Sequence, residues 1–246
     1  MTITDTPTDK PSFGVGARLG ETFSIFGKRF VVFAVIGGVV GVLGQVPFFF
    51  LMASAGPGAE ENFGVILLGA VPPLIIYQVM TGMLVLAAYD AKSGRPIRLG
   101  TYVMSALKRL LPLIVMAIFV YILIAIGLVL LIVPGVWVLG VTAVFVPAIM
   151  IEGAGFGAVG RSASLTKDYR WPIVLLLVVV YLIAYVIAFV MAIFVGLFGG
   201  VFLVVAQGLV SGITTSIVSI AVAMTYARLR EIKEGVGFTD LAEVFA

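Results

Sequence analysis

Long apolar blocks separated by short polar segments make up most of the chain. A helix needs about 20 apolar residues to cross about 30 Å of hydrocarbon, and most of the blocks reach that length. The apolar positions are continuous rather than alternating, which favours helices over a β-barrel. The pattern therefore predicts an all-α membrane protein with six transmembrane helices, at residues 30–53, 63–88, 110–133, 136–151, 171–197 and 201–226. Residues 13–226 form the predicted membrane domain, between a disordered cytoplasmic N-terminus (1–12) and a cytoplasmic tail (227–246).

Three of the predicted spans are preceded by a stretch with the apolar spacing of an amphipathic helix. The first contains Leu19, Phe23 and Phe26, the second contains Leu99, Val103 and Leu107, and the third, with a weaker match, contains Phe156, Val159 and Ala163. We expect these stretches to lie at the cytoplasmic membrane surface. The chain is then three units of an interfacial helix plus a helical hairpin. The alternative is that any basic loop leading into a span has this composition, without duplication.

The positive charges fix the expected orientation. The chain has 15 Lys and Arg residues. All of them lie before the first span, between spans two and three, between spans four and five, or after span six. The other three loops contain no Lys or Arg, and their only charged residues are Glu60 and Glu61. This positive-inside pattern predicts a multi-pass protein of the bacterial inner membrane with both termini in the cytoplasm. The net charge of +3 then marks a membrane surface, and we expect no nucleic-acid partner.

The composition argues against an enzyme. Cys and His are both absent, which removes thiolate chemistry and both the commonest general base and the commonest metal ligand. No charged residue lies deep in a predicted span, where proton-coupled carriers place theirs. No phosphate loop, zinc spacing or nucleophile elbow is found. We therefore predict no catalytic residues, no metal site and no cofactor.

Two sets of polar residues are candidates for binding. Cations at the span entries could bind anionic lipid headgroups: Lys28, Arg29, Lys108, Arg109 and Arg170. Uncharged polar residues inside the spans could form a solute pocket or hydrogen bonds between helices: Gln45, Gln78, Gln207, Thr214 and Ser216. Small residues four positions apart, at Gly37 and Gly41 and again at Gly208 and Gly212, predict close helix packing within the bundle.

Residues 131–172 carry a family resemblance through Pro134, Gly135, Glu152, Arg161, Ser162 and Trp171. Their order resembles the YciC-like proteins and the membrane domain attached to some glycerophosphoryl diester phosphodiesterases. The resemblance implies a six-span membrane protein of a largely uncharacterised group. Phosphodiesterase activity belongs to a separate soluble barrel, for which this chain has neither room nor a histidine. We expect the segment 152–171 either to carry the shared function or to end one span and cap the next.

Three functions remain open at this point. The first is a non-enzymatic inner-membrane protein that engages lipids, or a membrane-protein partner, through its basic amphipathic cytoplasmic helices. The second is a permease or channel for a neutral or amphiphilic solute that uses the Gln, Ser and Thr residues inside the spans. The third is a structural subunit of a membrane complex.

Overall fold

The computed structural model describes residues 11–56, 58, 61–195 and 200–236. Over these residues the chain is built from helices: α1 (Val15–Lys28), α2 (Phe30–Ala55), α3 (Phe63–Lys92), α4 (Leu99–Lys108), α5 (Leu110–Leu130), α6 (Ile132–Thr142), α7 (Phe145–Pro147), η2 (Ala148–Glu152), η3 (Gly155–Gly157), α8 (Ala158–Thr166), α9 (Arg170–Val195) and α10 (Gly200–Glu234). Six helical stretches, one of them the combined 132–152, are long and apolar enough to cross a membrane. The protein is therefore a multi-pass α-helical membrane protein, as the hydropathy pattern predicted.

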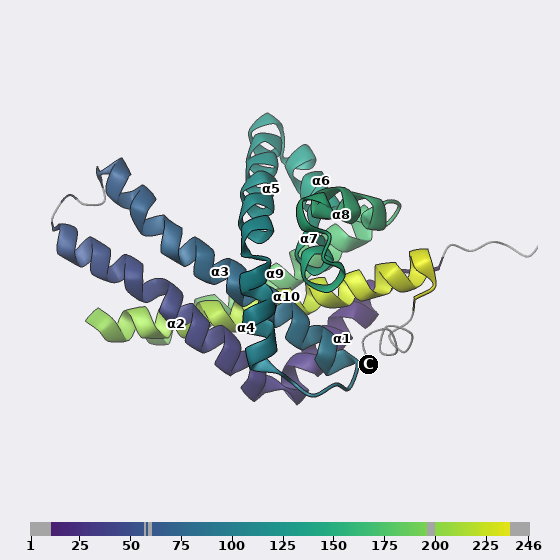
Figure 1. Cartoon of the computed structure of the whole chain (residues 1–246), viewed down its shortest axis with the longest axis horizontal. Coiled ribbons are helices and arrows are strands. Elements are labelled where there is room, and N and C mark those ends of the chain that lie inside the picture. The colour runs from purple at the N-terminus through teal and green to yellow at the C-terminus, as the bar shows by residue number, and fades with distance from the viewer. Residues whose placement is uncertain (1–10, 57, 59–60, 196–199, 237–246) are drawn as a thin grey trace, which may run out of the picture.

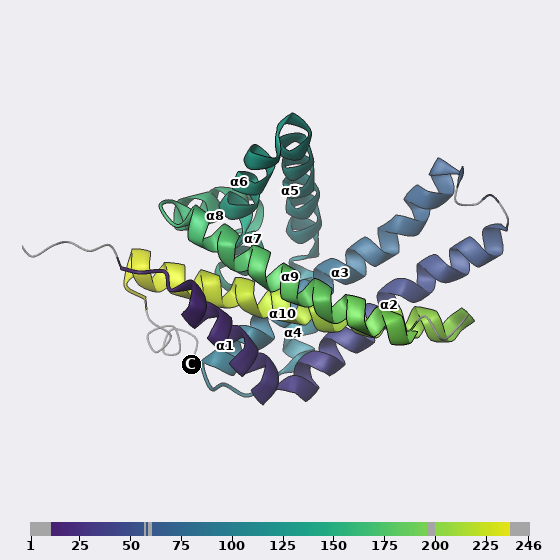
Figure 2. The same cartoon turned by 180° about the vertical axis from the view of Figure 1, so that it is seen from behind.

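The long helices form three hairpins that spread from a common centre (Figure 1). The α5–α6 hairpin extends to the top of Figure 1 and the α2–α3 hairpin to the upper left, while α9 and α10 run across the molecule. The view from behind shows the same divergence, with α1 and α4 near the point where the hairpins meet (Figure 2). The largest cluster of buried apolar side chains lies at this centre and includes Phe33, Leu84 and Met224.

The packing of α2 against α10 depends on glycine. A Cβ atom at Gly212 would overlap the backbone carbonyl of Gly37, and a Cβ at Gly41 would overlap that of Gly208. The two backbones can approach this closely only because neither helix has a side chain at the crossing. Ser216 adds a hydrogen bond across the seam, from its Oγ to the carbonyl oxygen of Phe33 at 3.1 Å. The predicted small-residue packing within the bundle is thus confirmed.

The turn between the third and fourth spans lies earlier than predicted. We expected it at Pro134 and Gly135, but Leu131 is the extended residue between α5 and α6, with φ −166° and ψ 151°. Pro134 instead lies in the first turn of α6, where its missing N–H removes no hydrogen bond within the helix. Gly135 packs against Gly127 of α5, and a Cβ at Gly127 would be 2.7 Å from the Cα of Gly135. The Pro-Gly pair therefore allows a close hairpin rather than forming its turn.

The fourth span is broken in the middle. Helix α6 ends at Thr142, and the chain continues through α7 and the π-helical turn η2 to Glu152. Ser162 of α8 satisfies the backbone groups at the break. Its Oγ donates to the carbonyl of Val141 at 2.7 Å and accepts from the N–H of Val144 at 3.2 Å. Broken helices persist at membrane depth only when such groups find partners, and Ser162 is completely buried.

Both ends of the predicted membrane domain need adjustment. The predicted sixth span stops at residue 226, whereas α10 continues to Glu234 and buries Ala227 and Leu229. The tail is therefore partly an extension of the last span. At the other end, the hydroxyl of Tyr169 donates to the carbonyl of Pro11 at 2.9 Å, so the ordered chain begins before residue 13. Residues 1–10 and 237–246 lie outside the described structure.

The short helices α1, α4 and α8 each precede a hairpin, in the order that the sequence predicted. They pack differently. The apolar residues of α1, among them Leu19 and Phe23, pack against a core cluster. Helix α4 buries Tyr102 and Ala106 but leaves most of its other apolar side chains exposed. That these helices lie in the membrane interface, and that the three units arose by duplication, stay predictions.

Candidate functional site

Glu152, at the end of the broken span, is the centre of a cluster of charged and polar side chains. Its carboxylate accepts two hydrogen bonds from the guanidinium of Arg161, both at 2.6 Å, and one from the hydroxyl of Tyr226 at 2.6 Å. Arg230 lies 3.3 Å from the same carboxylate. Glu234 then bridges the two guanidinium groups, pairing with Arg161 and accepting from Arg230 at 2.8 Å. We call these five residues the Glu152 cluster.

The cluster connects three elements that are distant in the sequence. Glu152 ends η2, and Arg161 lies on α8. Tyr226, Arg230 and Glu234 follow one another at four-residue spacing along one face of α10. The hydrogen bonds that Arg161 donates to the Glu152 carboxylate raise the pKa of the Arg161 guanidinium further above its usual range. The sequence singled out Glu152 and Arg161, and the structure brings them together. Tyr226, Arg230 and Glu234 were not identified from the sequence, because they were assigned to the end of a span and to the tail. Their four-residue spacing, which places them on one helix face, was the signal that could have found them.

The remaining residues of the predicted family motif do not join the cluster. Pro134 and Gly135 belong to the hairpin contact of α5 and α6, and Ser162 belongs to the helix break described above. Trp171 is 58% exposed at the start of α9. The motif residues are therefore divided among a hairpin contact, a helix break and the Glu152 cluster, and Trp171 belongs to none of the three.

The described cations differ in whether they have a carboxylate partner. One group has a carboxylate partner within 4 Å: Arg18, Lys92, Arg95, Arg161, Arg228, Arg230 and Lys233. Lys28, Arg29, Lys108 and Arg109, by contrast, form no ion pair with any residue that the structure describes. These four, which we call the joint cations, are the headgroup candidates that the sequence proposed at the first two span entries. Besides these four, Arg98, Lys167 and Arg170 form no ion pair with a described residue.

The joint cations occupy two equivalent positions. Lys28 ends α1 and Lys108 ends α4. Arg29 (φ −124°, ψ 31°) and Arg109 (φ −106°, ψ 12°) are the single non-helical residues between these short helices and the spans that follow. Each joint therefore bends the chain at an Arg and presents two adjacent positive charges at the entry of a span.

A cavity of about 490 Å³ lies at the first joint. Lys28 and Arg29 line it from one side, and Lys92, at the end of α3, lines it from the other. Glu21 contributes the one carboxylate and is bound to Lys92 at 2.7 Å. Three cations around one carboxylate leave an excess of positive charge that favours an anionic ligand.

The second joint is bordered by an exposed apolar surface. Leu99, Val103, Met104 and Leu107 of α4 are 37–54% exposed. They lie directly before Lys108 and Arg109. Apolar side chains next to cations are the composition of a helix that lies in the membrane interface.

Arg170, the fifth predicted headgroup cation, has a different environment. Its guanidinium carbon lies 4.5 Å from the ring centre of Trp137 on α6. It also donates to the carbonyl of Ala163 at 3.5 Å. Because a cation over an indole ring is already stabilised, Arg170 is a weaker headgroup candidate than the joint cations.

The uncharged polar candidates inside the spans are not gathered at one point. Ser216 closes the seam between α2 and α10, and Thr214 donates to carbonyls of its own helix. Ser216 thus makes the interhelical hydrogen bond that the sequence left as an alternative, whereas the bonds of Thr214 stay within α10. The three glutamines line three different cavities: Gln45 between α2 and α3, Gln207 between α9 and α10, and Gln78 among six helices.

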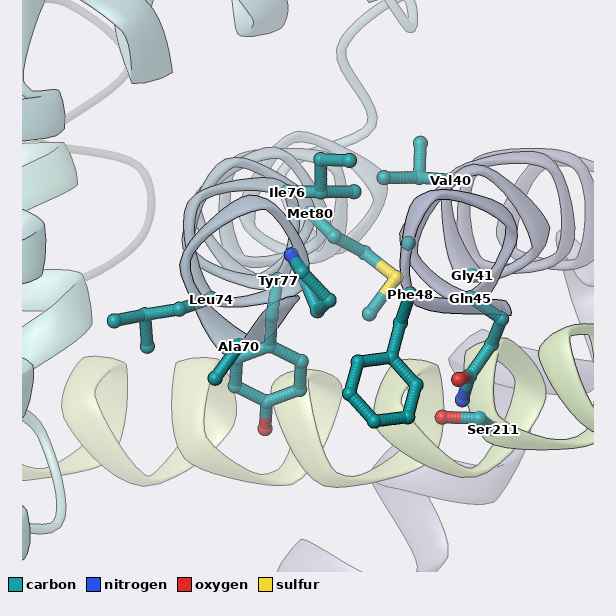
Figure 3. A pocket seen from close by; sticks show the side chains of 12 residues that line it. Val40, Gly41, Gln45, Phe48, Ala70, Leu74, Ile76, Tyr77, Met80 and Ser211 are labelled. Carbon is teal, nitrogen blue, oxygen red and sulfur yellow. The ribbon is translucent and has the colours of Figure 1, made fainter. Parts of the chain in front are cut away.

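The cavity at Gln45 is the largest of these, at about 540 Å³. Figure 3 shows α2 and α3 on either side, with Gln45 beside Ser211 of α10 and with Phe48, Tyr77 and Met80 reaching into the space between the helices. Most of the lining is apolar. This cavity is better suited to a hydrocarbon chain than to a hydrated solute.

The geometry defines a multi-pass membrane protein with a basic surface at two span entries and an ion cluster that ties α8 to α10. Comparison with family models, with curated proteins and with solved structures found no match for the chain. The resemblance to the YciC-like proteins therefore stays a prediction.

Proposed function

We propose that this protein is a non-enzymatic membrane protein that binds anionic lipid through its joint cations. The observation that carries the proposal is the division of the cations. Seven of the described cations are paired with carboxylates, whereas Lys28, Arg29, Lys108 and Arg109, two adjacent pairs at span entries, have none among the described residues. A cation held next to hydrocarbon without a counter-charge is stabilised by an anion, and the membrane surface supplies phosphate groups.

The proposal includes the orientation of the chain. The joint cations and the loops with the other Lys and Arg residues face the cytoplasm of a bacterium, and the three hairpin ends face the periplasm. Helix α4, with its exposed apolar side chains, then lies in the headgroup region of the inner leaflet. Each Lys or Arg near an anionic surface contributes about 1 kcal/mol. Two adjacent cations therefore strengthen binding about 30-fold.

Retention of phospholipid by the purified full-length chain tests the proposal. The protein is extracted from nanodiscs of equal parts phosphatidylglycerol and phosphatidylcholine, and bound lipid is measured by native mass spectrometry. We expect the wild type to retain phosphatidylglycerol preferentially. The variant Lys108→Gln/Arg109→Gln should lose most of that preference.

A matched control removes the same charge from cations that already have partners. Arg228 pairs with Glu231 and Lys233 with Asp168, each at 2.8 Å. The control variant Arg228→Gln/Lys233→Gln should therefore retain phosphatidylglycerol as the wild type does. Equal retention by both double variants would show that net charge, rather than the joint, governs lipid binding, and would refute the proposal. The permease and subunit hypotheses stay predictions.

A further inference from the structure

Three tyrosines from three different hairpins meet near the middle of the spans. Tyr77 lies near the centre of α3, Tyr121 near the centre of α5 and Tyr181 near the centre of α9. Tyrosine in membrane proteins is concentrated at the two interfaces, where its hydroxyl reaches water or headgroups. Three tyrosines at mid-depth therefore need another explanation.

All three tyrosines line one cavity of about 140 Å³ among α3, α5, α6, α7, α9 and α10. Further polar side chains in the same lining are Gln78, Thr81, Thr142 and Ser219. None of the described residues that line the cavity carries a charge. The cavity is thus a concentration of uncharged hydrogen-bonding groups inside the hydrocarbon region.

Part of this polar lining has no hydrogen-bond partner among the residues that the structure describes. The hydroxyls of Thr81 and Thr142 donate to carbonyls of their own helices, at 3.1 and 2.8 Å. The hydroxyls of Tyr77 and Tyr181 form no hydrogen bond to any described residue. Lipid tails offer them none, and leaving a hydroxyl unpaired in hydrocarbon is unfavourable.

We propose that this cavity is a binding site for a small uncharged molecule that carries several hydroxyl groups. Such a ligand accepts hydrogen bonds from Tyr77 and Tyr181 and donates to the amide oxygen of Gln78. The cavity has room for about four or five waters at about 30 Å³ each, which suits a molecule the size of glycerol. A charged ligand is excluded because no counter-charge lines the site. The site is independent of lipid binding at the joint cations.

A second cavity extends the site along the groove between α9 and α10. It measures about 200 Å³, shares Tyr77, Tyr181 and Val218 with the first, and adds Thr214 and Thr215. The polar lining therefore continues towards the lipid-facing side of the protein. Two sources of the same chemistry are consistent with this arrangement: a free polyol, or the hydroxyl-bearing head of a neutral lipid.

Saturation-transfer NMR on the full chain in phosphatidylcholine nanodiscs tests the site. The probes are glycerol for the free polyol, 1,2-dioctanoylglycerol for the neutral lipid and glycerol 3-phosphate as the charged analogue. We expect specific binding of glycerol or of dioctanoylglycerol, and no competition by glycerol 3-phosphate. Whichever uncharged probe binds identifies the source.

The variant Tyr77→Phe/Tyr181→Phe removes two hydroxyls and keeps both rings, so packing is preserved. Its affinity for the bound probe should fall about tenfold. Tyr169→Phe removes a hydroxyl that donates to Pro11 outside the cavity, and it should bind as the wild type does. The proposal is overturned if neither uncharged probe binds, if the double variant binds as tightly as the wild type, or if glycerol 3-phosphate competes equally.

Discussion

Replacing Glu152 with glutamine tests whether the Glu152 cluster stabilises the fold. The substitution preserves the shape of the side chain and removes the carboxylate charge that accepts hydrogen bonds from Arg161 and Tyr226 and pairs with Arg230. Hydrogen bonds to a charged group contribute about 1.5–3 kcal/mol each. They are not additive here, because Glu234 stays as a carboxylate for both arginines. We therefore expect a loss of about 2–3 kcal/mol in the free energy of unfolding.

That loss should lower the melting temperature by about 4–12 °C, at about 2–4 °C per kcal/mol for a chain of this size. Circular dichroism of the purified protein in detergent measures it. The control is Glu231→Gln, which breaks the exposed pair with Arg228. Such exposed pairs contribute about 0–1 kcal/mol. If the melting temperature of Glu152→Gln fell no further than that of Glu231→Gln, the conclusion that the Glu152 cluster stabilises the contact of α8 with α10 would be wrong.

Three further predictions concern the packing of the spans and their orientation in the membrane. Gly212→Val places a side chain on the carbonyl of Gly37 and should lower the free energy of unfolding by at least about 1–3 kcal/mol, measured as a fall in melting temperature. The control is Gly20→Val, at an exposed position with open space around it, and it should have a smaller effect. Ser162→Ala leaves the N–H of Val144 without its hydrogen-bond acceptor and should lower the free energy of unfolding by about 1–3 kcal/mol. An unchanged melting temperature would mean that other groups bond to the backbone at the helix break. Reporter domains fused within the loops that follow α2, α5 and α9 should all report the periplasm, and a cytoplasmic signal from any one would overturn the orientation.

The hydropathy pattern predicted the number of spans because hydrocarbon imposes a minimum length on every helix that crosses it. It placed the turn after α5 incorrectly for a local reason. A Pro-Gly pair usually marks a turn, but proline is equally tolerated in the first turn of a helix, and only the contact of Gly127 with Gly135 decides between the two. The continuation of α10 beyond residue 226 was missed because its charged residues read as a tail. They are in fact the groups that pair with Glu152 and Arg161.

Which polar residues meet is a question of helix crossing, and the sequence alone does not contain the answer. The pairing of Glu152 with Arg161 spans nine residues and is suggested by their opposite charges. The bond from Tyr226 to Glu152 spans 74 residues and exists only because α10 crosses beside η2. The same holds for Tyr77, Tyr121 and Tyr181, which read separately as isolated aromatic residues in three spans. Glycine contacts such as that between Gly37 and Gly212 set how closely the helices cross. Those crossings determine which polar side chains share a cavity and which face the lipid.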